Sequence, residues 1–115
     1  MKKSILVTGG AGYIGAHICK ALASDGFTPI AYDNLVCGHL DSIKWGPFEF
    51  GDISDHARLI EVIKKHKPVA VIHLAAYAYV GESMGNPGKY YRNNVAGSLT
   101  LLEAMRDSGI KNIMF

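Results

Sequence analysis

Several features that mark particular protein classes are scarce in this sequence. Its 115 residues include two cysteines, four prolines and no long apolar run. Cys19 and Cys37 lie far apart without metal-ligand spacing, which predicts reduced thiols rather than a disulfide framework or a zinc site. The apolar run near the N-terminus is too short for a signal peptide. We therefore expect a cytoplasmic protein with no membrane partner and no metal site.

An excess of charge of one sign is also missing. The chain carries 12 basic and 10 acidic side chains, a formal net charge of +2, and they are spread without a run. Nucleic-acid-binding domains concentrate Lys and Arg in patches, so we expect no nucleic-acid partner. No repeat or linker-like stretch divides the chain, and its 49% hydrophobic content suits one packed domain over residues 1–115.

Short apolar runs alternate along the chain with longer segments of helical spacing, which is typical of a parallel sheet covered by helices. The expected strands are residues 4–7, 27–32, 48–50, 69–74 and 113–115. The strand at 69–74 is apolar except for His73, which predicts burial on both faces. Pro29 lacks an N–H, so it should lie near the start of the second strand.

Three helices are expected between these strands. The first ends at Asp25-Gly26 and has apolar residues at helical spacing, namely Ile14, Ile18, Ala21 and Leu22. The second ends at Lys67-Pro68, and its predicted core stripe is Leu59, Val62 and Ile63. The third extends from about Tyr90 to Asp107 and stops at Ser108-Gly109, and its predicted buried face is Val95, Leu99, Leu102 and Met105.

A glycine-rich turn, with Gly9, Gly12 and Gly15 spaced GxxGxxG, joins the first strand to the first helix. Such glycines allow a tight turn, close approach of a pyrophosphate, and close helix packing. The helix N-terminus then offers N–H groups to the phosphates. This context predicts a Rossmann-type, doubly wound parallel sheet, incomplete with about five strands.

Asp33 ends the second strand, about 20 residues after the glycines. Its carboxylate suits the two hydroxyls of an adenosine ribose but would meet like charge in a 2′-phosphate, which favours NAD over NADP. The alternative is that Asp33 only forms a turn before Asn34. His73 lies in an apolar strand and is interpreted as a hydrogen-bonded core histidine, without a chemical role.

The segments TGGAGYIG, DNLVCGH, GDI, HLAAYAYVGES and YYRNNVAGSL resemble the extended short-chain dehydrogenase/reductases, and within them the UDP-glucose 4-epimerases. The resemblance covers nearly the whole chain. It implies an NAD-dependent enzyme that removes hydride from C4 of a UDP-sugar and returns it to the opposite face. Alternatives are a UDP-arabinose or UDP-xylose 4-epimerase, a 4,6-dehydratase, or a non-catalytic NAD-binding module. A structural domain without ligand is a further alternative.

The same resemblance implies a role for each matching position. The residues expected at the pyrophosphate are Gly9, Gly12, Tyr13, Ile14 and Gly15, and those near the adenosine ribose are Asp33, Asn34, Cys37 and Gly38. Asp52 and Ile53 would flank the adenine, with Asp52 accepting its exocyclic amine and Ile53 contacting the ring face. The cofactor would also be lined by Leu74, Ala75, Ala76 and Asn93, and the UDP-sugar would be approached by Val80, Glu82 and Ser83. The alternatives are packing roles for Tyr13, Cys37 and the two alanines, and a helix cap for Asp52. Glu82 could equally be a solvated loop charge, and Asn94 could take the role given to Asn93.

Two departures from the family pattern stand out. Many members carry a lysine where this chain has Ala78, within the segment expected near the cofactor. The family's catalytic pair is Tyr-x-x-x-Lys, and no tyrosine here is followed by lysine at the fourth position. We therefore expect no catalytic residue in residues 1–115, which would be an N-terminal fragment of a longer enzyme. An open sheet edge in such a fragment predicts a homodimer or larger assembly.

Overall fold

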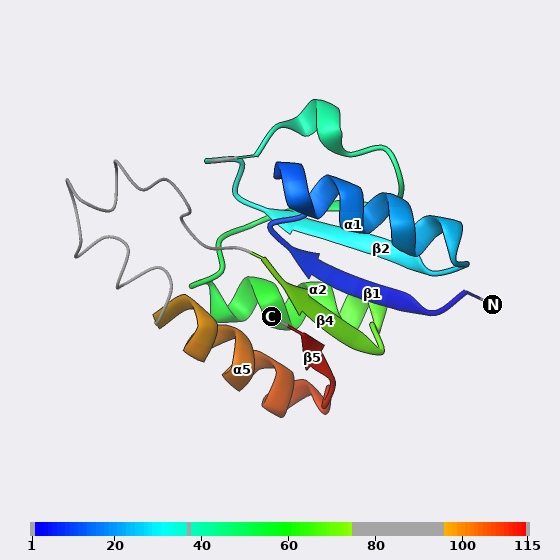
Figure 1. The fold of residues 1–115 in the computed structure, drawn as a ribbon. Helices are drawn as coiled ribbons and strands as arrows, with labels where there is room; N and C mark the ends of the chain where they lie inside the picture. Colours follow the sequence, from blue (N-terminus) through cyan, green and yellow to red (C-terminus); the bar gives the residue numbers. More distant parts are fainter. Residues whose placement is uncertain (1, 37, 75–95, 115) are drawn as a thin grey trace.

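The computed structural model describes residues 2–36, 38–74 and 96–114, which form a parallel five-stranded sheet with helices on both faces (Figure 1). The strand order is β3-β2-β1-β4-β5, and every pair is parallel. The strands are β1 (Ser4–Thr8), β2 (Thr28–Asp33), β3 (Phe48–Phe50), β4 (Ala70–His73) and β5 (Ile113–Met114). The predicted doubly wound α/β fold is confirmed.

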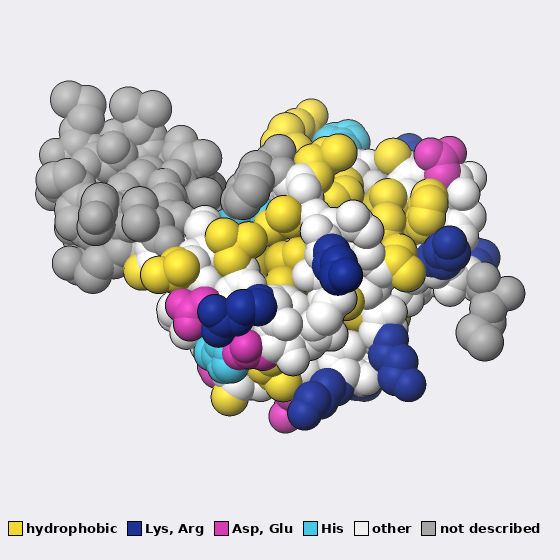
Figure 2. Space-filling model, turned by 90° about the horizontal axis from the view of Figure 1, so that it is seen from below, with side chains coloured by type: hydrophobic (Ala, Val, Ile, Leu, Met, Phe, Trp, Pro, Cys, Tyr) yellow, Lys and Arg dark blue, Asp and Glu magenta, His cyan; other side chains and the backbone are white. Residues whose placement is uncertain are grey.

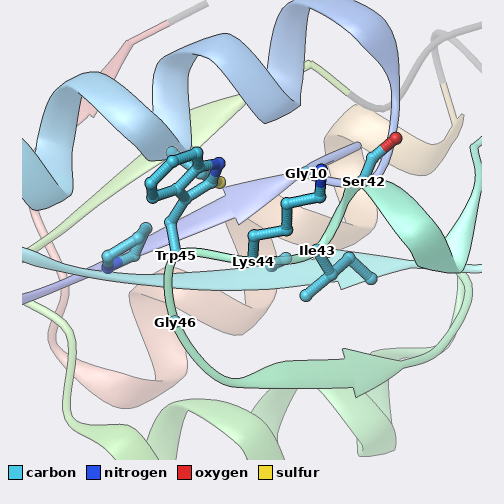
Figure 3. Close-up of a pocket in the computed structure, with 9 residues that line it drawn as sticks. Gly10, Ser42, Ile43, Lys44, Trp45 and Gly46 are labelled. Atoms are coloured by element: carbon cyan, nitrogen blue, oxygen red, sulfur yellow. The ribbon is translucent and has the colours of Figure 1, made fainter.

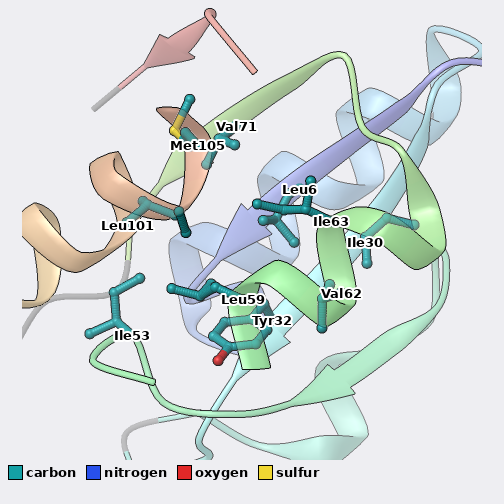
Figure 4. Close-up of a cluster of buried hydrophobic side chains, with 11 residues drawn as sticks. Leu6, Ile30, Tyr32, Ile53, Leu59, Val62, Ile63, Val71, Leu101 and Met105 are labelled. Atoms are coloured by element: carbon teal, nitrogen blue, oxygen red, sulfur yellow. The ribbon is translucent and has the colours of Figure 1, made fainter. Parts of the chain in front are cut away.

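Alternate residues of the strands face two separate cores. Leu6, Ile30 and Val71 point toward α2 (His56–His66) and α5 (Gly97–Ser108), as Figure 4 shows. Ile5, Val7 and Ala31 face α1 (Tyr13–Ser24) on the other side, where Cys19 is buried. Strands with apolar residues on both faces are what a sheet covered on both sides requires. Among the described residues, every helix is too short or too polar to cross a lipid bilayer.

The second helix, α2, follows its sequence pattern closely. The predicted stripe of Leu59, Val62 and Ile63 is buried, with exposed fractions of 0%, 0% and 3%. The N-cap is Asp55, whose side chain accepts a hydrogen bond from the N–H of Arg58 at 3.1 Å. At the other end Lys67 adopts the left-handed conformation before Pro68, which confirms the predicted stop.

The predicted buried face of α5 is confirmed at Met105 and wrong at Leu99 and Leu102. Leu99 and Leu102 are 57% and 41% exposed, and the buried positions are Gly97, Leu101, Ala104 and Met105. A Cβ on Gly97 would lie 2.5 Å from Cγ2 of Ile53. The small residues Gly97 and Ala104 therefore allow α5 to approach the core closely. The face that they bury carries less apolar surface than the face with Leu99 and Leu102. Gly109, at φ 77°, confirms the predicted stop, whereas Val95 and the predicted start near Tyr90 lie outside the described residues.

The predicted strand at 69–74 is longer than β4. Val69 is 42% exposed, and within β4 Val71 and His73 are buried while Ala70 and Ile72 are only partly buried. The predicted burial on both faces is therefore confirmed for one face and only in part for the other. Pro29 lies at the second position of β2, as predicted. Thr28 N–H donates to the carbonyl of Lys3, just before β1, and Ala31 N–H donates to that of Pro47, just before β3. Because the N–H groups of successive residues point to opposite sides of a strand, residue 29 faces the β3 side. β3 begins at Phe48, opposite Ala31, so it does not extend as far as Pro29. The missing N–H of Pro29 therefore costs no hydrogen bond between the two strands.

The segment between β2 and β3 contains a short 3-10 helix, Leu40–Ser42, and then passes over α1. Only a narrow crevice remains between this segment, α1 and β2 (Figure 3). Lys20 Nζ lies 5.7 Å from the centre of the Trp45 ring. Cys19 is buried beneath, and burial raises the pKa of its thiol to about 11. Cys19 is thus an inert reduced thiol, as predicted, while Cys37 lies outside the described residues.

A buried carboxylate ties β3 to α2. Glu49 is 7% exposed and pairs with Arg58 Nη2 at 2.7 Å, Lys65 Nζ at 3.0 Å and His66 Nε2 at 2.7 Å. The hydrogen bond from His66, with those from Lys65 and Arg58, outweighs burial and lowers the pKa of Glu49 to about 2. Because the folded pKa lies below the ordinary value of 4.5, the charged carboxylate stabilises the fold above that pH.

We expect Glu49→Gln to lower the free energy of unfolding at pH 7 by about 1–3 kcal/mol, the usual cost of losing hydrogen bonds to a charged group. The difference from wild type should shrink as the pH falls from about 4.5 toward 2, because the wild-type carboxylate then also becomes protonated. Urea unfolding at pH 7 and pH 3 measures both effects. Glu61→Gln, which removes an exposed partner of Arg58, is the matched control and should change stability by less than about 0.5 kcal/mol.

Candidate functional site

The candidate site lies at the carboxyl ends of the strands, around the turn that joins β1 to α1. The strand order reverses here, because β2 and β3 lie on one side of β1 and β4 and β5 on the other. In open parallel sheets, ligands bind in the crevice outside the carboxyl ends at such a reversal. The residues described below surround this point.

Gly9 and Gly15 are required by the folded chain itself. Gly9 has φ 75°, a conformation that favours glycine, and its N–H donates to the carbonyl of Tyr32 at 2.8 Å. A Cβ on Gly15 would lie 2.1 Å from the Gly9 carbonyl oxygen and 2.8 Å from Gly10 Cα. These contacts agree with the predicted roles in the tight turn and in close packing of the helix on the sheet.

By contrast, nothing among the described residues requires glycine at position 12. Its φ of −77° and ψ of 175° suit any residue. A Cβ here would meet only the Gly9 carbonyl oxygen, at an ordinary contact distance of 3.4 Å. Gly12 is also the N-cap of α1 and provides no side-chain capping hydrogen bond. The absence of a side chain therefore leaves room directly at the N-terminus of α1, where anions are favoured.

Gly10 is a structural residue that the sequence pattern did not single out. A Cβ at this position would lie 2.7 Å from Ala31 Cβ and 3.0 Å from the Val7 carbonyl oxygen. Tyr13 and Ile14, in the first turn of α1, are 79% and 59% exposed. The Tyr13 ring contacts His17 edge-on, with the ring centres 4.7 Å apart. Both predicted pyrophosphate residues are thus at the open end of the helix, and Tyr13 also has a packing contact.

Asp33 fastens the glycine-rich turn to the end of β2. Its Oδ2 accepts the N–H of Ala11 at 3.1 Å, and its Oδ1 accepts the N–H of Leu35 at 2.7 Å. The predicted turn-forming role is therefore real, since the second bond supports Leu35 at a positive φ of 63°. A carboxylate has about four acceptor positions, so these two hydrogen bonds leave two of them, and 8% of the residue is exposed.

The segment after Asp33 packs directly on the glycine-rich turn. His39 N–H donates to the Ala11 carbonyl at 3.0 Å, and a Cβ on Gly38 would lie 2.8 Å from Ala11 Cβ. Gly38 is therefore needed for this close approach. Its neighbour Cys37 lies outside the described residues.

Asp52 and Ile53 follow β3 at the same edge of the sheet. Asp52 does not cap α2, because Asp55 does, so the capping alternative is wrong. Burial raises the pKa of Asp52, but hydrogen bonds from Ser54 and Asn34 outweigh this and hold it below its ordinary value. Ile53 is 4% exposed and packs against Gly97, which leaves little of its side chain open to a ligand.

His73 is a hydrogen-bonded core histidine, as predicted. Its Nδ1 lies 2.6 Å from Thr8 Oγ1 and its Nε2 lies 2.9 Å from Ser98 Oγ. Burial lowers the pKa of His73, which favours the neutral ring. Leu74 N–H donates to the carbonyl and the hydroxyl of Thr8. This network joins the carboxyl ends of β1 and β4 to α5, and the sequence pattern did not indicate Thr8 or Ser98.

The structure thus brings together the predicted residues of the turn, of the ends of β2 and β3, and Leu74. The predicted site residues outside the described residues are Cys37, Ala75, Ala76, Val80, Glu82, Ser83 and Asn93. Their roles stay predictions.

Comparison with known proteins places this geometry in a family. The sequence model of the NAD dependent epimerase/dehydratase family matches residues 5–115. The chain is 51% identical over 113 residues to the UDP-glucose 4-epimerase of Rhizobium leguminosarum bv. trifolii, covering 98% of this chain and 35% of that protein. It is 53% identical over 112 residues to that of Rhizobium meliloti (strain 1021), covering 97% of this chain and 34% of that protein.

A solved structure is similar to this chain in both fold and sequence. The UDP-glucose 4-epimerase from Brucella ovis, in complex with NAD, superposes with a TM-score of 0.94 and 54% identity. The match covers 96% of this chain and 34% of that one. The chain therefore spans about a third of the length of the curated relatives it matches.

Proposed function

Because the chain belongs to the NAD dependent epimerase/dehydratase family, we propose that residues 1–115 form the NAD-binding Rossmann domain of a UDP-glucose 4-epimerase. The relatives named above are UDP-glucose 4-epimerases, and the Brucella ovis protein is in complex with NAD. The relatives are about three times as long as the matched region, which supports a longer enzyme with this domain in its N-terminal part.

The observation that carries the proposal is the space at Gly12. Neither its backbone conformation nor its described neighbours require glycine, whereas a pyrophosphate at the N-terminus of α1 does. Tyr13, Ile14 and Gly15 begin the same helix, so their N–H groups are in the first turn, where no intrahelical partner exists. These groups would hold the phosphates, and Asp33 would accept the ribose hydroxyls.

Bound NAD supplies the hydride acceptor for C4 of the sugar in this proposed reaction. The residues of this chain bind and orient the cofactor: Asp33 keeps the turn against β2 while it accepts the hydroxyls, and Gly38 lets the following segment close on Ala11. The Thr8–His73–Ser98 network joins the carboxyl ends of β1 and β4 to α5. We assign no catalytic acid or base to residues 1–115.

Calorimetric titration of the protein with NAD and NADP tests the cofactor proposal. We expect NAD to bind about 100-fold more tightly or better, because a 2′-phosphate would place like charge against the Asp33 carboxylate. Asp33→Asn should narrow this ratio, and its thermal unfolding should be checked because Asp33 also bonds Ala11 and Leu35. Equal affinities for the wild type would contradict the role of Asp33, and binding of neither dinucleotide would contradict the function.

The substrate proposal concerns the whole enzyme. We propose that the full-length protein interconverts UDP-glucose and UDP-galactose as part of galactose metabolism, on the support of the relatives' activity. Formation of UDP-galactose from UDP-glucose by the full-length gene product is the assay. No turnover of either sugar would reject the proposal.

We also propose that the protein self-associates as a homodimer. In support, large hydrophobic side chains lie exposed on α5 and on the edge strand β5, namely Leu99, Leu102 and Met114. Figure 2 shows hydrophobic side chains open to solvent between basic ones on the face seen from below. Exposed apolar patches of this kind are typical of protein interfaces.

A further inference from the structure

Both the nitrogen and the oxygen of the Asn34 side-chain amide form hydrogen bonds within the protein. Its Nδ2 donates to Asp52 Oδ2 at 3.0 Å, and its Oδ1 accepts the N–H of Val36 at 3.0 Å. The first bond spans 18 positions of the chain and joins the segment after β2 to the segment after β3. The amide orientation is determined, because the reverse orientation would place oxygen against carboxylate and NH₂ against N–H. Asn34 is therefore held as a bridge.

Asp52 is held just as firmly at the other end of this bridge. Its Oδ1 accepts the N–H of Ser54 at 2.9 Å and the Ser54 hydroxyl at 2.7 Å. Its carbonyl oxygen accepts the Tyr32 hydroxyl at 2.6 Å. Three of the roughly four acceptor positions of the carboxylate are thus occupied. The one that remains belongs to Oδ2, the oxygen that Asn34 holds in place.

The two carboxylates, Asp33 and Asp52, follow neighbouring strands. Asp33 lies opposite Phe50 in the β2–β3 register, and Gly51 N–H donates to the Asp33 carbonyl at 3.1 Å. Moving outward along the sheet edge, the order is the glycine-rich turn, then Asp33, then Asp52. A dinucleotide with its phosphates at the turn and its ribose at Asp33 therefore extends its base over the end of β3, beside Asp52.

We propose that Asn34 is a positioning residue for base selection: it holds the Asp52 carboxylate as an acceptor for a base that presents an amino group. Adenine presents such a group at C6, whereas hypoxanthine presents a carbonyl oxygen that would face the carboxylate unfavourably. This role rests on the proposed NAD-binding function. It differs from a direct contact between Asn34 and the ribose, which the family resemblance alone suggested, because it acts through Asp52.

The test compares the affinities for NAD and for nicotinamide hypoxanthine dinucleotide by calorimetry. We expect the wild type to prefer NAD about 10- to 100-fold, the usual weight of one hydrogen bond to a charged group. Asn34→Asp keeps the acceptor for Val36 N–H but loses the donor to Asp52. The two dinucleotides carry the same net charge, so the added carboxylate repels the phosphates of both equally. In Asn34→Asp the ratio of the two affinities should therefore be at least about 5-fold smaller than in the wild type.

Two further variants complete the test. Asn34→Leu keeps the shape of the side chain without its polar groups, and it should lower the preference similarly. Asp52→Asn offers the base an amide and should abolish the preference. Thermal unfolding identifies a variant that does not fold, and the remaining variants then decide the result.

The outcomes separate the role of Asn34 from the proposed function. If the Asn34 variants lose affinity for both dinucleotides equally, or keep the wild-type preference, the positioning role is overturned. Either result would leave the proposed NAD-binding function standing. Failure of the wild type to bind either dinucleotide would overturn the proposed function and the role of Asn34 with it.

Discussion

Gly12→Ala is expected to lower the affinity for NAD about 10- to 100-fold while the free energy of unfolding falls by less than about 1 kcal/mol. The added methyl group would occupy the space at the N-terminus of α1 where we place the pyrophosphate. Overpacking of a closely fitted contact costs about 1–3 kcal/mol, which corresponds to this range of affinity. Among the residues that the structure describes, the methyl group would meet only the Gly9 carbonyl oxygen, at 3.4 Å.

The stability of this variant is as informative as its affinity. Alanine is a poorer N-cap than glycine, and the expected loss is below about 1 kcal/mol. Calorimetry with NAD and thermal unfolding without ligand measure the two quantities on one sample. Wild-type affinity in the stable variant would show that no ligand group approaches Gly12, and the proposed site would then be wrong.

Gly15→Ala is expected to act on folding instead. Its methyl group would lie 2.1 Å from the Gly9 carbonyl oxygen and 2.8 Å from Gly10 Cα, and both neighbours are main chain. Neither neighbour can rotate away, so β1, the turn and α1 would have to separate. We expect a loss of about 3 kcal/mol or more, the upper end for overpacked sites. For a protein of this size that corresponds to a fall of more than about 10 °C in Tm.

Gly12→Ala is the matched control for this variant, because it adds the same methyl group three residues earlier in the same turn. Thermal unfolding of both variants, followed by circular dichroism, measures the difference. A Tm for Gly15→Ala within a few degrees of that for Gly12→Ala would mean that α1 can move away from the turn at little cost. The close packing of helix on sheet would then not be what requires the third glycine.

Much of the fold is predictable because its signals are local. The apolar runs of β1 and β2, the stripe of α2 and the stops at Lys67 and Gly109 depend on residues a few positions apart, and all are confirmed. The spacing of the glycines and Asp33 is equally local to one strand-helix-strand unit. It predicted which loop and which strand end form the site, and the structure brings them together through the Asp33–Ala11 bond.

The buried face of α5 was not predictable in this way. The helix carries leucines on more than one side, and hydrophobicity alone favoured Leu99 and Leu102 over Gly97 and Ala104. The side that faces the core is decided by how closely Ile53 approaches the helix, and only a small residue at position 97 permits that approach. The requirement for Gly10 likewise comes from Ala31 on the neighbouring strand.

The sequence by itself determined the order of strands and helices along the chain, the place of the glycine-rich turn and the pairing of that turn with Asp33. Each of these follows from residues close together along the chain. Only the tertiary structure decided that, among the described residues, a Cβ at Gly12 would make one ordinary contact whereas a Cβ on Gly15 would clash with the main chain. It also decided that Asn34 meets Asp52. Such contacts depend on the register of neighbouring strands and on distances of a few tenths of an ångström, which spacing along the chain does not contain.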